Sequence, residues 1–294
     1  MPVAALKRYI PLLFVLLWST GFIGARFGLP YIEPFNFLFI RMLVTLLVFL
    51  GLVLAFHAAW PGPRQALHQM VVGSLVHAGY LGGVFAAIDW QMPAGVASLI
   101  VGLQPLLTAV LAWVVWRQRL LPLQWLGLVL GLLGVALVLA GGNRLGQFDL
   151  NAPALISVLI ALVAISLGTL YQKHFGQGVN LLTGSFYQYL ATALWMGLLT
   201  WMFETGEVDW QPELIGALAW LVLGLSVSAI LLLLLMIREG EASRVASYFY
   251  LVPPVTAIEA WLLFDEQLGA LALLGVGVTV SGVYLVLRRQ AASS

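Results

Sequence analysis

The chain has 294 residues, of which 62% are apolar and only 9% are charged. A soluble domain carries about 25% charged residues, so a soluble fold of this length would lack the charges to cover its surface. The composition therefore indicates an integral membrane protein and excludes a soluble enzyme, a nucleic-acid binder and a single-span receptor, while the lack of cysteine excludes disulfides and thiolate metal sites.

Ten apolar stretches are long enough to cross a bilayer. A transmembrane helix needs about 20 apolar residues, and charged or turn-forming residues such as Pro61-Gly62-Pro63 separate the stretches. In chain order the predicted spans are 9–29, 34–56, 66–88, 91–116, 123–141, 152–172, 181–203, 214–237, 242–264 and 267–287. We therefore predict an all-α integral membrane protein with ten transmembrane helices.

Basic residues gather on one side of this topology. With ten spans, both termini and alternate loops share one side, which holds ten of the 13 Lys and Arg residues, while the other side holds two. The ten are Lys7, Arg8, Arg64, Arg117, Arg119, Lys173, Arg238, Arg244, Arg288 and Arg289. Because cytoplasmic loops carry the excess of Lys and Arg, the pattern predicts that both termini are cytoplasmic.

The second half of the chain repeats the first. The matches are Ser19 with Ser166 and Gly21 with Gly168 at a shift of 147, Gly134 with Gly282 at 148, and Pro105 with Pro254 at 149. Residues 1–147 and 148–294 would then be two repeats of five spans each. Because five is odd, the second repeat enters the membrane from the opposite side, which predicts a 5+5 inverted repeat around a central cavity, as in secondary transporters. Duplication for stability alone is the alternative.

Arg41 lies within the second span, where a charge is costly and often functional. Its guanidinium could reach the outer headgroups by snorkelling. Alternatively, it faces the central cavity, where it meets a substrate carboxylate or a protein partner. We favour the cavity.

His77 and Tyr80 lie in the middle of the third span, three residues apart and hence on one helical face. A lone intramembrane histidine is often a satisfied packing residue, whereas a histidine beside a tyrosine can form a polar-aromatic cavity wall. No second His, Asp or Glu stands at ligand spacing, so we expect no metal site.

Two spans carry proline near their middle, Pro105 in the fourth and Pro254 in the ninth. Proline bends a helix and frees a carbonyl group, and paired interruptions in matching positions of two repeats point to a binding site. We therefore predict that both prolines are hinges, with Gln104 and Tyr248 near the solute. A bend that shapes the helix without touching a ligand is the alternative.

Glu259 is the clearest carboxylate within a span. It is a candidate for proton coupling, a partner for Arg41 or Arg26, or a group that reaches the outer water. Spans 5 and 10 carry small residues four apart, Gly127 with Gly131 and Gly277 with Ser281, which favour close helix contact. We assign these two spans to a scaffold or a subunit interface.

The chain resembles the EamA branch of the drug/metabolite transporter superfamily over its whole length. The matching residues are Trp18-Ser19-Thr20-Gly21-Phe22, Arg41, Ala97-Ser98 to Pro105, the joint Trp116 to Leu120 with Gly127 and Gly134, and its second copy from Asp265 to Leu268 with Gly275 and Gly282. The family usually has Glu where Gln118 stands, although Glu266 keeps it in the second half. The resemblance implies either a proton-independent facilitator or a proton-linked exporter, and the chain is similar to YddG-type exporters of aromatic and other amino acids.

Together, these features predict a secondary transporter that exports small metabolites, most of all amino acids, from a bacterium across its inner membrane. The predicted substrate-binding residues are Ser19, Arg41, His77, Tyr80, Gln104 and Tyr248. We expect a small-molecule substrate, the lipid bilayer as surroundings, no cofactor, no nucleic acid, and either a monomer or a weak homodimer. Because no Walker A sequence is present, we expect that the protein does not itself hydrolyse ATP. The alternatives are an exporter of drugs or organic cations, a channel, and an intramembrane enzyme that uses Ser74 and His77 as a dyad.

The topology yields the first testable prediction. Reporter fusions at residues 64, 119 and 289 should give a cytoplasmic signal, and fusions near 144 and 207 an external one, because the positive side of a membrane protein stays in the cytoplasm. A cytoplasmic signal at residue 207 would contradict both the ten-span topology and the inverted repeat.

Overall fold

The structure is a computed structural model that describes residues 9–116, 121–144, 151–176, 178–229, 232, 251–266 and 269–288. The described part is almost entirely helical, and an isolated antiparallel bridge between Ile32 and Val208 is its only extended pairing. Helices satisfy their backbone hydrogen bonds internally, which hydrocarbon demands of any chain that crosses it. The prediction of an all-α membrane protein is therefore confirmed.

Four of the described helices begin at a proline. Pro34, Pro63, Pro122 and Pro212 are each the first residue of a helix, a position where the missing N–H group is not needed. The elements are α2 (Ile10–Gly28), η1 (Leu29–Tyr31), α3 (Pro34–Ala55), α4 (Pro63–Val72), η2 (Gly73–Gly79), α5 (Tyr80–Asp89), α6 (Ala94–Val101), α7 (Gln104–Trp116), α8 (Pro122–Arg144), α9 (Ala152–Phe175), α10 (Leu181–Phe203), α11 (Pro212–Trp220), η3 (Leu221–Ala229), α14 (Val252–Phe264) and α15 (Ala270–Arg288).

Ten helical segments of the described chain coincide with the ten predicted spans. Five have 18 residues or more and are apolar enough to cross a membrane: Ile10–Tyr31, Pro34–Ala55, Pro63–Asp89, Ala152–Phe175 and Pro212–Ala229. The others are α10 and the shorter apolar stretches Ala94–Thr108, Pro122–Val138, Val252–Phe264 and Ala270–Leu285. Parts of the eighth and ninth predicted spans lie outside the described residues. Helices α3 and α10, α7 and α14, and α8 and α15 begin 147 or 148 residues apart. This spacing is what a repeat would produce, and the repeat itself stays a prediction.

The chain groups into two compact units, which we describe separately. The first unit consists of Met1–Gly24, Gln91–Ala152 and Leu223–Ser294, and the second of Ala25–Trp90 and Pro153–Val222. Each unit draws on both sequence halves, so it is a different division from the predicted repeats 1–147 and 148–294, which stay a prediction.

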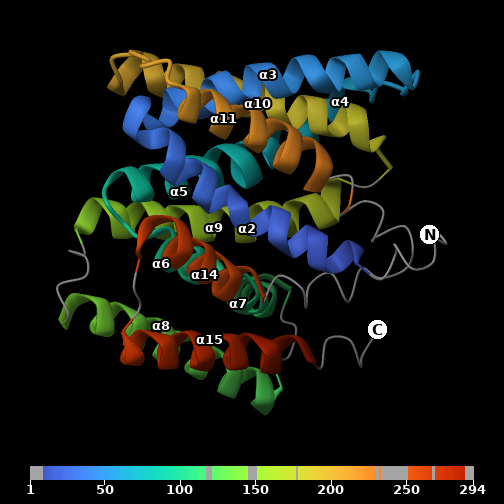
Figure 1. Cartoon of the computed structure of the whole chain (residues 1–294). Helices are drawn as coiled ribbons and strands as arrows, with labels where there is room; N and C mark the ends of the chain where they lie inside the picture. The colour runs from blue at the N-terminus through green and yellow to red at the C-terminus, as the bar shows by residue number, and fades with distance from the viewer. Residues whose placement is uncertain are drawn as a thin grey trace. The chain divides into compact units, whose positions relative to one another are not determined.

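Glycines bring α8 and α15 of the first unit into close contact, and Figure 1 shows the two helices side by side. A Cβ atom on Gly134 would collide with the backbone of Gly275 and Thr279, and one on Gly282 would collide with Gly127 and Gly131. The close helix contact expected of spans 5 and 10 is therefore present, with one correction, and their role as a scaffold or a subunit interface stays a prediction.

The correction concerns the α15 side of this contact. Gly277 has open space where its Cβ would be, and Ser281 is exposed. The contacting residues of α15 are Gly275 and Gly282, which also lie on one face of the helix because seven residues make about two turns.

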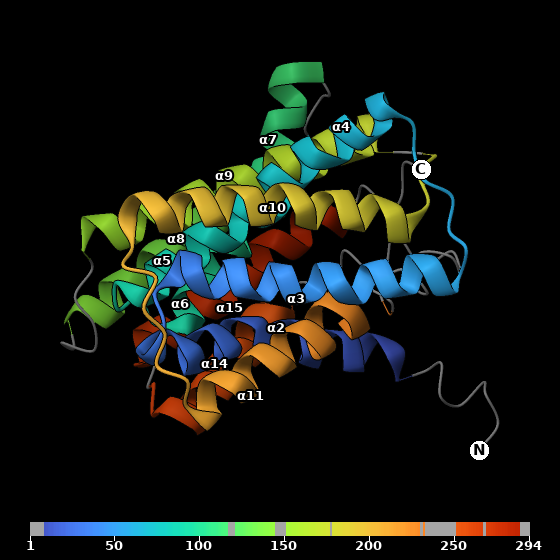
Figure 2. The same cartoon turned by 90° about the horizontal axis from the view of Figure 1, so that it is seen from above.

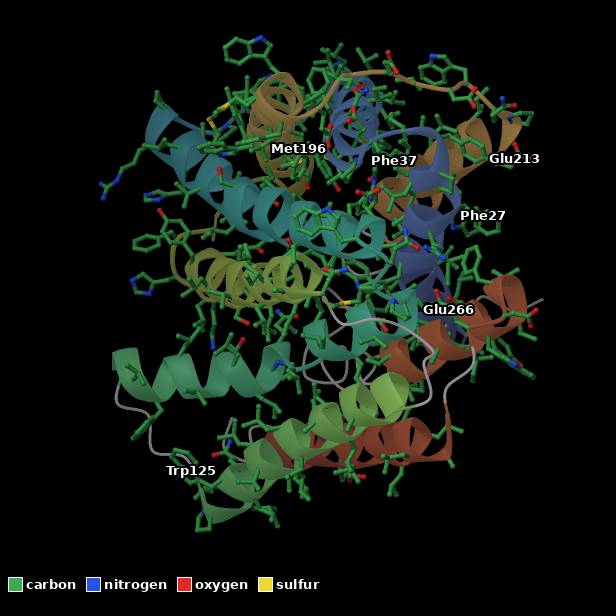
Figure 3. All side chains as sticks on the ribbon, turned by 90° about the vertical axis from the view of Figure 1, so that its left-hand side faces the viewer. Phe27, Phe37, Trp125, Met196, Glu213 and Glu266 are labelled. Atoms are coloured by element: carbon green, nitrogen blue, oxygen red, sulfur yellow. The ribbon has the colours of Figure 1, made fainter. Side chains whose placement is uncertain are left out.

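Helices α6 and α14 form the other closely packed pair of the first unit. A Cβ on Gly95 would lie 3.4 Å from the Cα and 3.5 Å from the Cβ of Ala257, so the two backbones approach closely. At the end of α14 the Glu266 carboxylate accepts a hydrogen bond from the Ala94 N–H at 3.4 Å, and Glu266 is labelled in Figure 3. Because the first N–H groups of a helix lack partners and attract negative charge, Glu266 caps α6.

In the second unit, α3 and α10 run along each other, as Figures 1 and 2 show. Phe37 of α3 and Met196 of α10, both labelled in Figure 3, are buried. The Phe37 ring meets Phe85 of α5 edge to face, with centroids 5.4 Å apart. These apolar side chains form the core that joins α3, α5 and α10.

The third predicted span contains the π-helical segment η2, between α4 and α5. Gly73 of η2 approaches α10 so closely that a Cβ would collide with the Gln188 backbone, and Gly168 of α9 approaches Leu75 and Val76 in the same way. A π-helical segment widens the helix and often marks a functional site. Here it brings the face of His77 against α10.

Two glutamates tie the start of α3 to the loop after α10. Glu204 accepts hydrogen bonds from the N–H groups of Phe35 and Asn36, both at 2.7 Å. In return, Glu33 accepts from the N–H and hydroxyl groups of Thr205 at 2.8 and 2.9 Å. Burial raises the pKa of Glu204 although the two N–H groups lower it, and the nearby charge of Glu33 raises it further. The two N–H groups at the α3 N-terminus therefore partly offset the free-energy cost of burying the Glu204 carboxylate.

Replacing Glu204 with alanine should lower the thermal stability of the purified protein. The two N–H groups would lose their cap, which typically costs about 1–2 kcal/mol. Differential scanning fluorimetry in detergent would measure the change. Glu207→Ala is the matched control, since that side chain is exposed in the same loop, and an equal loss of stability in both variants would contradict the capping role.

Candidate functional site

The second unit gathers polar side chains in its interior from three different spans. Arg41 comes from α3, His77 from η2, Tyr80 from the start of α5, and Gln188 and Tyr189 from α10. Arg41 is 4% exposed and Tyr80 8% exposed. We call these five residues the Arg41 cluster. Its position follows from the packing of α10 against both α3 and η2.

A directed chain of hydrogen bonds holds one side of the cluster. The Gln188 side-chain amide donates to the Gln69 side-chain oxygen at 2.7 Å, so the remaining Gln188 oxygen is the atom that faces His77 Nε2 at 3.2 Å. Because a carbonyl oxygen only accepts, His77 must donate from Nε2. A neutral histidine then keeps Nδ1 as an acceptor.

Aromatic stacking fixes the plane of the same histidine. The His77 and Tyr189 rings stack with centroids 4.7 Å apart and 26° between their planes. Tyr189 in turn contacts Phe49 of α3 at 5.3 Å. His77 is therefore hydrogen-bonded at Nε2 and stacked on one ring face, and its place in a cavity wall stays a prediction.

Arg41 lies inside the second unit and does not snorkel to a surface, since it is only 4% exposed. Its guanidinium is close enough to Tyr80, Tyr189 and His77 to interact with each of them electrostatically. A buried guanidinium that lies among neutral hydrogen-bonding groups could attract an anionic group of a solute.

The remaining predicted site residues do not belong to the described part of the second unit. Ser19 of α2 belongs to the first unit and is hydrogen-bonded to Glu259 of α14 at 2.8 Å. Gln104, the first residue of α7, also belongs to the first unit and is partly exposed. Tyr248 lies outside the described residues. Thus the structure brings together Arg41, His77 and Tyr80, and it separately pairs Ser19 with Glu259.

The prolines mark helix starts and not bends within a helix. The fourth span is broken at Gly102-Leu103 between α6 and α7, and Pro105 is the second residue of α7. Pro254 likewise lies in the first turn of α14. The first turn is where proline fits without breaking a helical hydrogen bond, so the expected bend in the fourth span is a break, while the ninth span before residue 251 lies outside the described residues. The role of both prolines as hinges stays a prediction.

The proposed Ser74–His77 dyad is not formed. The Ser74 hydroxyl donates to the Met70 carbonyl at 2.9 Å and accepts from Trp195 Nε1 at 2.9 Å, while His77 Nε2 is bonded to Gln188. A serine nucleophile needs its base within hydrogen-bond reach. Among the described residues, no group of three His, Cys, Asp or Glu side chains could hold a metal ion.

Sequence reasoning missed Tyr189 of the Arg41 cluster and Gln69 beside it. Tyr189 stacks on His77, and Gln69 accepts from Gln188 and donates to the Gly176 carbonyl at 3.5 Å; neither was a candidate. Gln69 carried a usable signal, since a glutamine in an apolar span is costly unless it has a partner. Tyr189 carried none, because tyrosines are common in membrane helices and belts.

The sequence and the fold both resemble those of known proteins. The model of the EamA-like transporter family matches residues 9–140 and 152–288, one stretch in each predicted half. A solved crystal structure superimposes with a TM-score of 0.66 at 20% sequence identity and covers 99% of each chain, a likeness that speaks for the fold alone.

Curated relatives align along nearly the whole chain. The Uncharacterized inner membrane transporter YedA of Escherichia coli (strain K12) is 27% identical, covering 95% of this chain and 92% of its own. The Uncharacterized transporter YvbV of Bacillus subtilis (strain 168) is 27% identical, covering 92% and 88%. A Salmonella typhimurium protein named "Probable amino-acid metabolite efflux pump" is 26% identical, covering 94% and 93%.

Replacing Pro105 or Pro254 with alanine should slow transport several-fold while leaving thermal stability nearly unchanged. In Pro105→Ala the new N–H group could bond to the Val101 carbonyl and join α6 to α7, which removes the break. Transport would be measured in proteoliposomes and stability by fluorimetry. Pro122→Ala is the control, because Pro122 also begins a helix but belongs to the packed α8–α15 pair. Normal transport by both variants would exclude a hinge role.

Proposed function

Because the chain belongs to the EamA-like transporter family, we propose that it is a secondary transporter that exports amino acids or related small metabolites by alternating access. The setting would be the inner (plasma) membrane of a bacterium, with both termini in the cytoplasm as the distribution of Lys and Arg predicts. The working unit is a monomer or a weak homodimer.

The observation that carries this proposal is the Arg41 cluster. An amino acid presents a carboxylate and an ammonium group a short distance apart. The Arg41 guanidinium supplies the charge that a carboxylate requires, and His77 Nδ1 and the tyrosine hydroxyls supply acceptors for an ammonium group. The name of the Salmonella relative points to the same class of substrate.

The rings of Tyr80 and Tyr189 favour aromatic amino acids within this class. Tyrosine offers a stacking face together with a hydroxyl group, and Tyr189 already stacks on His77. The similarity to YddG-type exporters supports this narrower substrate range. Cationic drugs are the competing substrates, because aromatic rings also attract cations.

A proteoliposome screen would test the proposal directly. The purified protein is reconstituted and supplied with each amino acid and with a set of cationic drugs, with and without a pH gradient. Saturable counterflow of one or more amino acids is the expected result. Counterflow of cationic drugs alone would support the alternative substrate class, and flux that never saturates would indicate a channel.

On a confirmed substrate, His77→Ala and Tyr80→Phe should each raise the half-saturation concentration. Losing one good hydrogen bond to a charged group costs about 1.5–3 kcal/mol, or roughly ten- to a hundredfold in affinity. Tyr187→Phe is the control, since Tyr187 lies two residues before Tyr189 on α10 but packs against Trp60. If both variants keep wild-type kinetics, the site assignment is wrong even though the family is right.

A further inference from the structure

A carboxylate and a hydroxyl group from two different spans meet inside the first unit. Ser19 of α2 is fully buried, and its Oγ lies 2.8 Å from Oε1 of Glu259 on α14. The Ser19 Oγ also lies 2.9 Å from the carbonyl oxygen of Leu16 on its own helix. One hydroxyl group therefore stands at hydrogen-bond distance from two oxygen atoms.

The number of available hydrogens indicates which protonation state of Glu259 fits the two contacts of Ser19. A serine hydroxyl has one hydrogen, and both a carbonyl oxygen and an ionised carboxylate only accept. If Glu259 were ionised, Ser19 could satisfy either Glu259 or Leu16, and the other contact would lack a hydrogen. If Glu259 is protonated, its O–H donates to Ser19 Oγ while Ser19 donates to the Leu16 carbonyl, and both contacts are satisfied.

The surroundings of Glu259 favour the same neutral state. Its second oxygen, Oε2, is buried and finds no hydrogen-bond partner among the described residues, and neither does the buried Oγ1 of Thr256 one turn earlier. An ionised carboxylate in such a place would be left with little to replace its hydration.

Within the first unit, the described parts of α2 and α6 carry no charge that compensates for this. Helix α6, which packs against α14, carries no titratable side chain. Residues 10–24 of α2 also carry none. Arg26 lies seven residues beyond Ser19 on α2, and the nearest acids on the α14 side, Asp265 and Glu266, follow the end of that helix. Glu259 is thus the sole titratable group of α14.

We propose that Glu259 is the proton-binding site of this transporter and that Ser19 is the residue that positions its proton. A hydronium ion from the side of higher proton concentration gives its proton to Glu259 Oε1 and leaves as water. The neutral pair is the form that can be buried, and exposure of Glu259 to the opposite side returns the proton to water. One proton would then cross for each cycle, in exchange for the exported solute. This inference rests on the proposed transport function.

Gradient-driven transport by Glu259→Gln provides the main test. The amide has the shape of the neutral acid and can donate to Ser19, but it carries no exchangeable charge. In proteoliposomes we expect this variant to lose accumulation driven by a pH gradient at least about tenfold while keeping substrate counterflow without a gradient. Glu207→Gln, in an exposed loop, should keep both. Gradient-driven accumulation by Glu259→Gln at the wild-type level would overturn the proposal.

Ser19→Ala tests the direction of the hydrogen bond. If the Glu259 acid donates to Ser19, removing the acceptor weakens the neutral form, so the midpoint of the pH–rate profile should move to lower pH. A shift to higher pH would mean that Ser19 stabilises the ionised carboxylate, which would contradict the proposal.

Infrared difference spectroscopy separates this inference from the proposed function, because it needs no substrate. In wild-type protein at neutral pH we expect a carboxylic-acid C=O band that is absent from Glu259→Gln. If the band is present but no solute is transported, the transport function is wrong and the proton site remains. If the two spectra are identical in this region, Glu259 is ionised and the proposal fails.

Discussion

A backbone N–H or C=O group without a partner costs several kcal/mol in hydrocarbon, where no water can replace the missing hydrogen bond. This constraint makes the described chain almost wholly helical, and it also governs the helix ends. Where α3 and α6 begin, the carboxylates of Glu204 and Glu266 satisfy N–H groups that the helices leave open. Where the fourth span breaks, a proline occupies the position at which an N–H group is not needed.

Helices in lipid are not driven together by the hydrophobic effect, because the lipid tails are themselves apolar. Their close packing therefore depends on small residues. Glycines supply it in both units, at Gly134 and Gly282 between α8 and α15 and at Gly73 between η2 and α10. Close approach at Gly73 has a chemical consequence, because it brings the Gln188 side chain within reach of both His77 and Gln69. Packing and polar chemistry are therefore linked at this point of the second unit.

Polar side chains inside the spans collect in two places with opposite chemistry. In the second unit a buried cation, Arg41, lies among neutral donors and acceptors. In the first unit a lone carboxyl group, Glu259, meets a single hydroxyl group. A carrier that exchanges a solute for a proton needs two such functions, a group that holds the solute and a group that changes charge. Because each unit holds one of these groups, each can be altered by mutation without removing the other.

Much of this protein can be predicted from the sequence because the bilayer acts on composition and length alone. About 20 apolar residues between breaks define a span, so the ten spans coincide with ten helical segments. Residues Arg41, His77 and Tyr80 stood out as polar groups in apolar stretches, and the structure places them in one cluster.

Other features depend on which helix faces which, and a single chain does not encode that in any local pattern. Gly277 and Ser281 have the same spacing as a packing motif, yet the contact uses Gly275 and Gly282, because the rotation of α15 about its axis is set by its neighbour. Pro105 predicts an interruption in its span, but only the arrangement of α6 and α7 makes it a break and not a bend. Similarly, the sequence by itself identified Glu259 as a carboxylate within a span with three candidate roles. Only the tertiary structure placed Ser19 against it, since a hydrogen bond between residues 240 positions apart arises from packing and leaves no trace in their spacing.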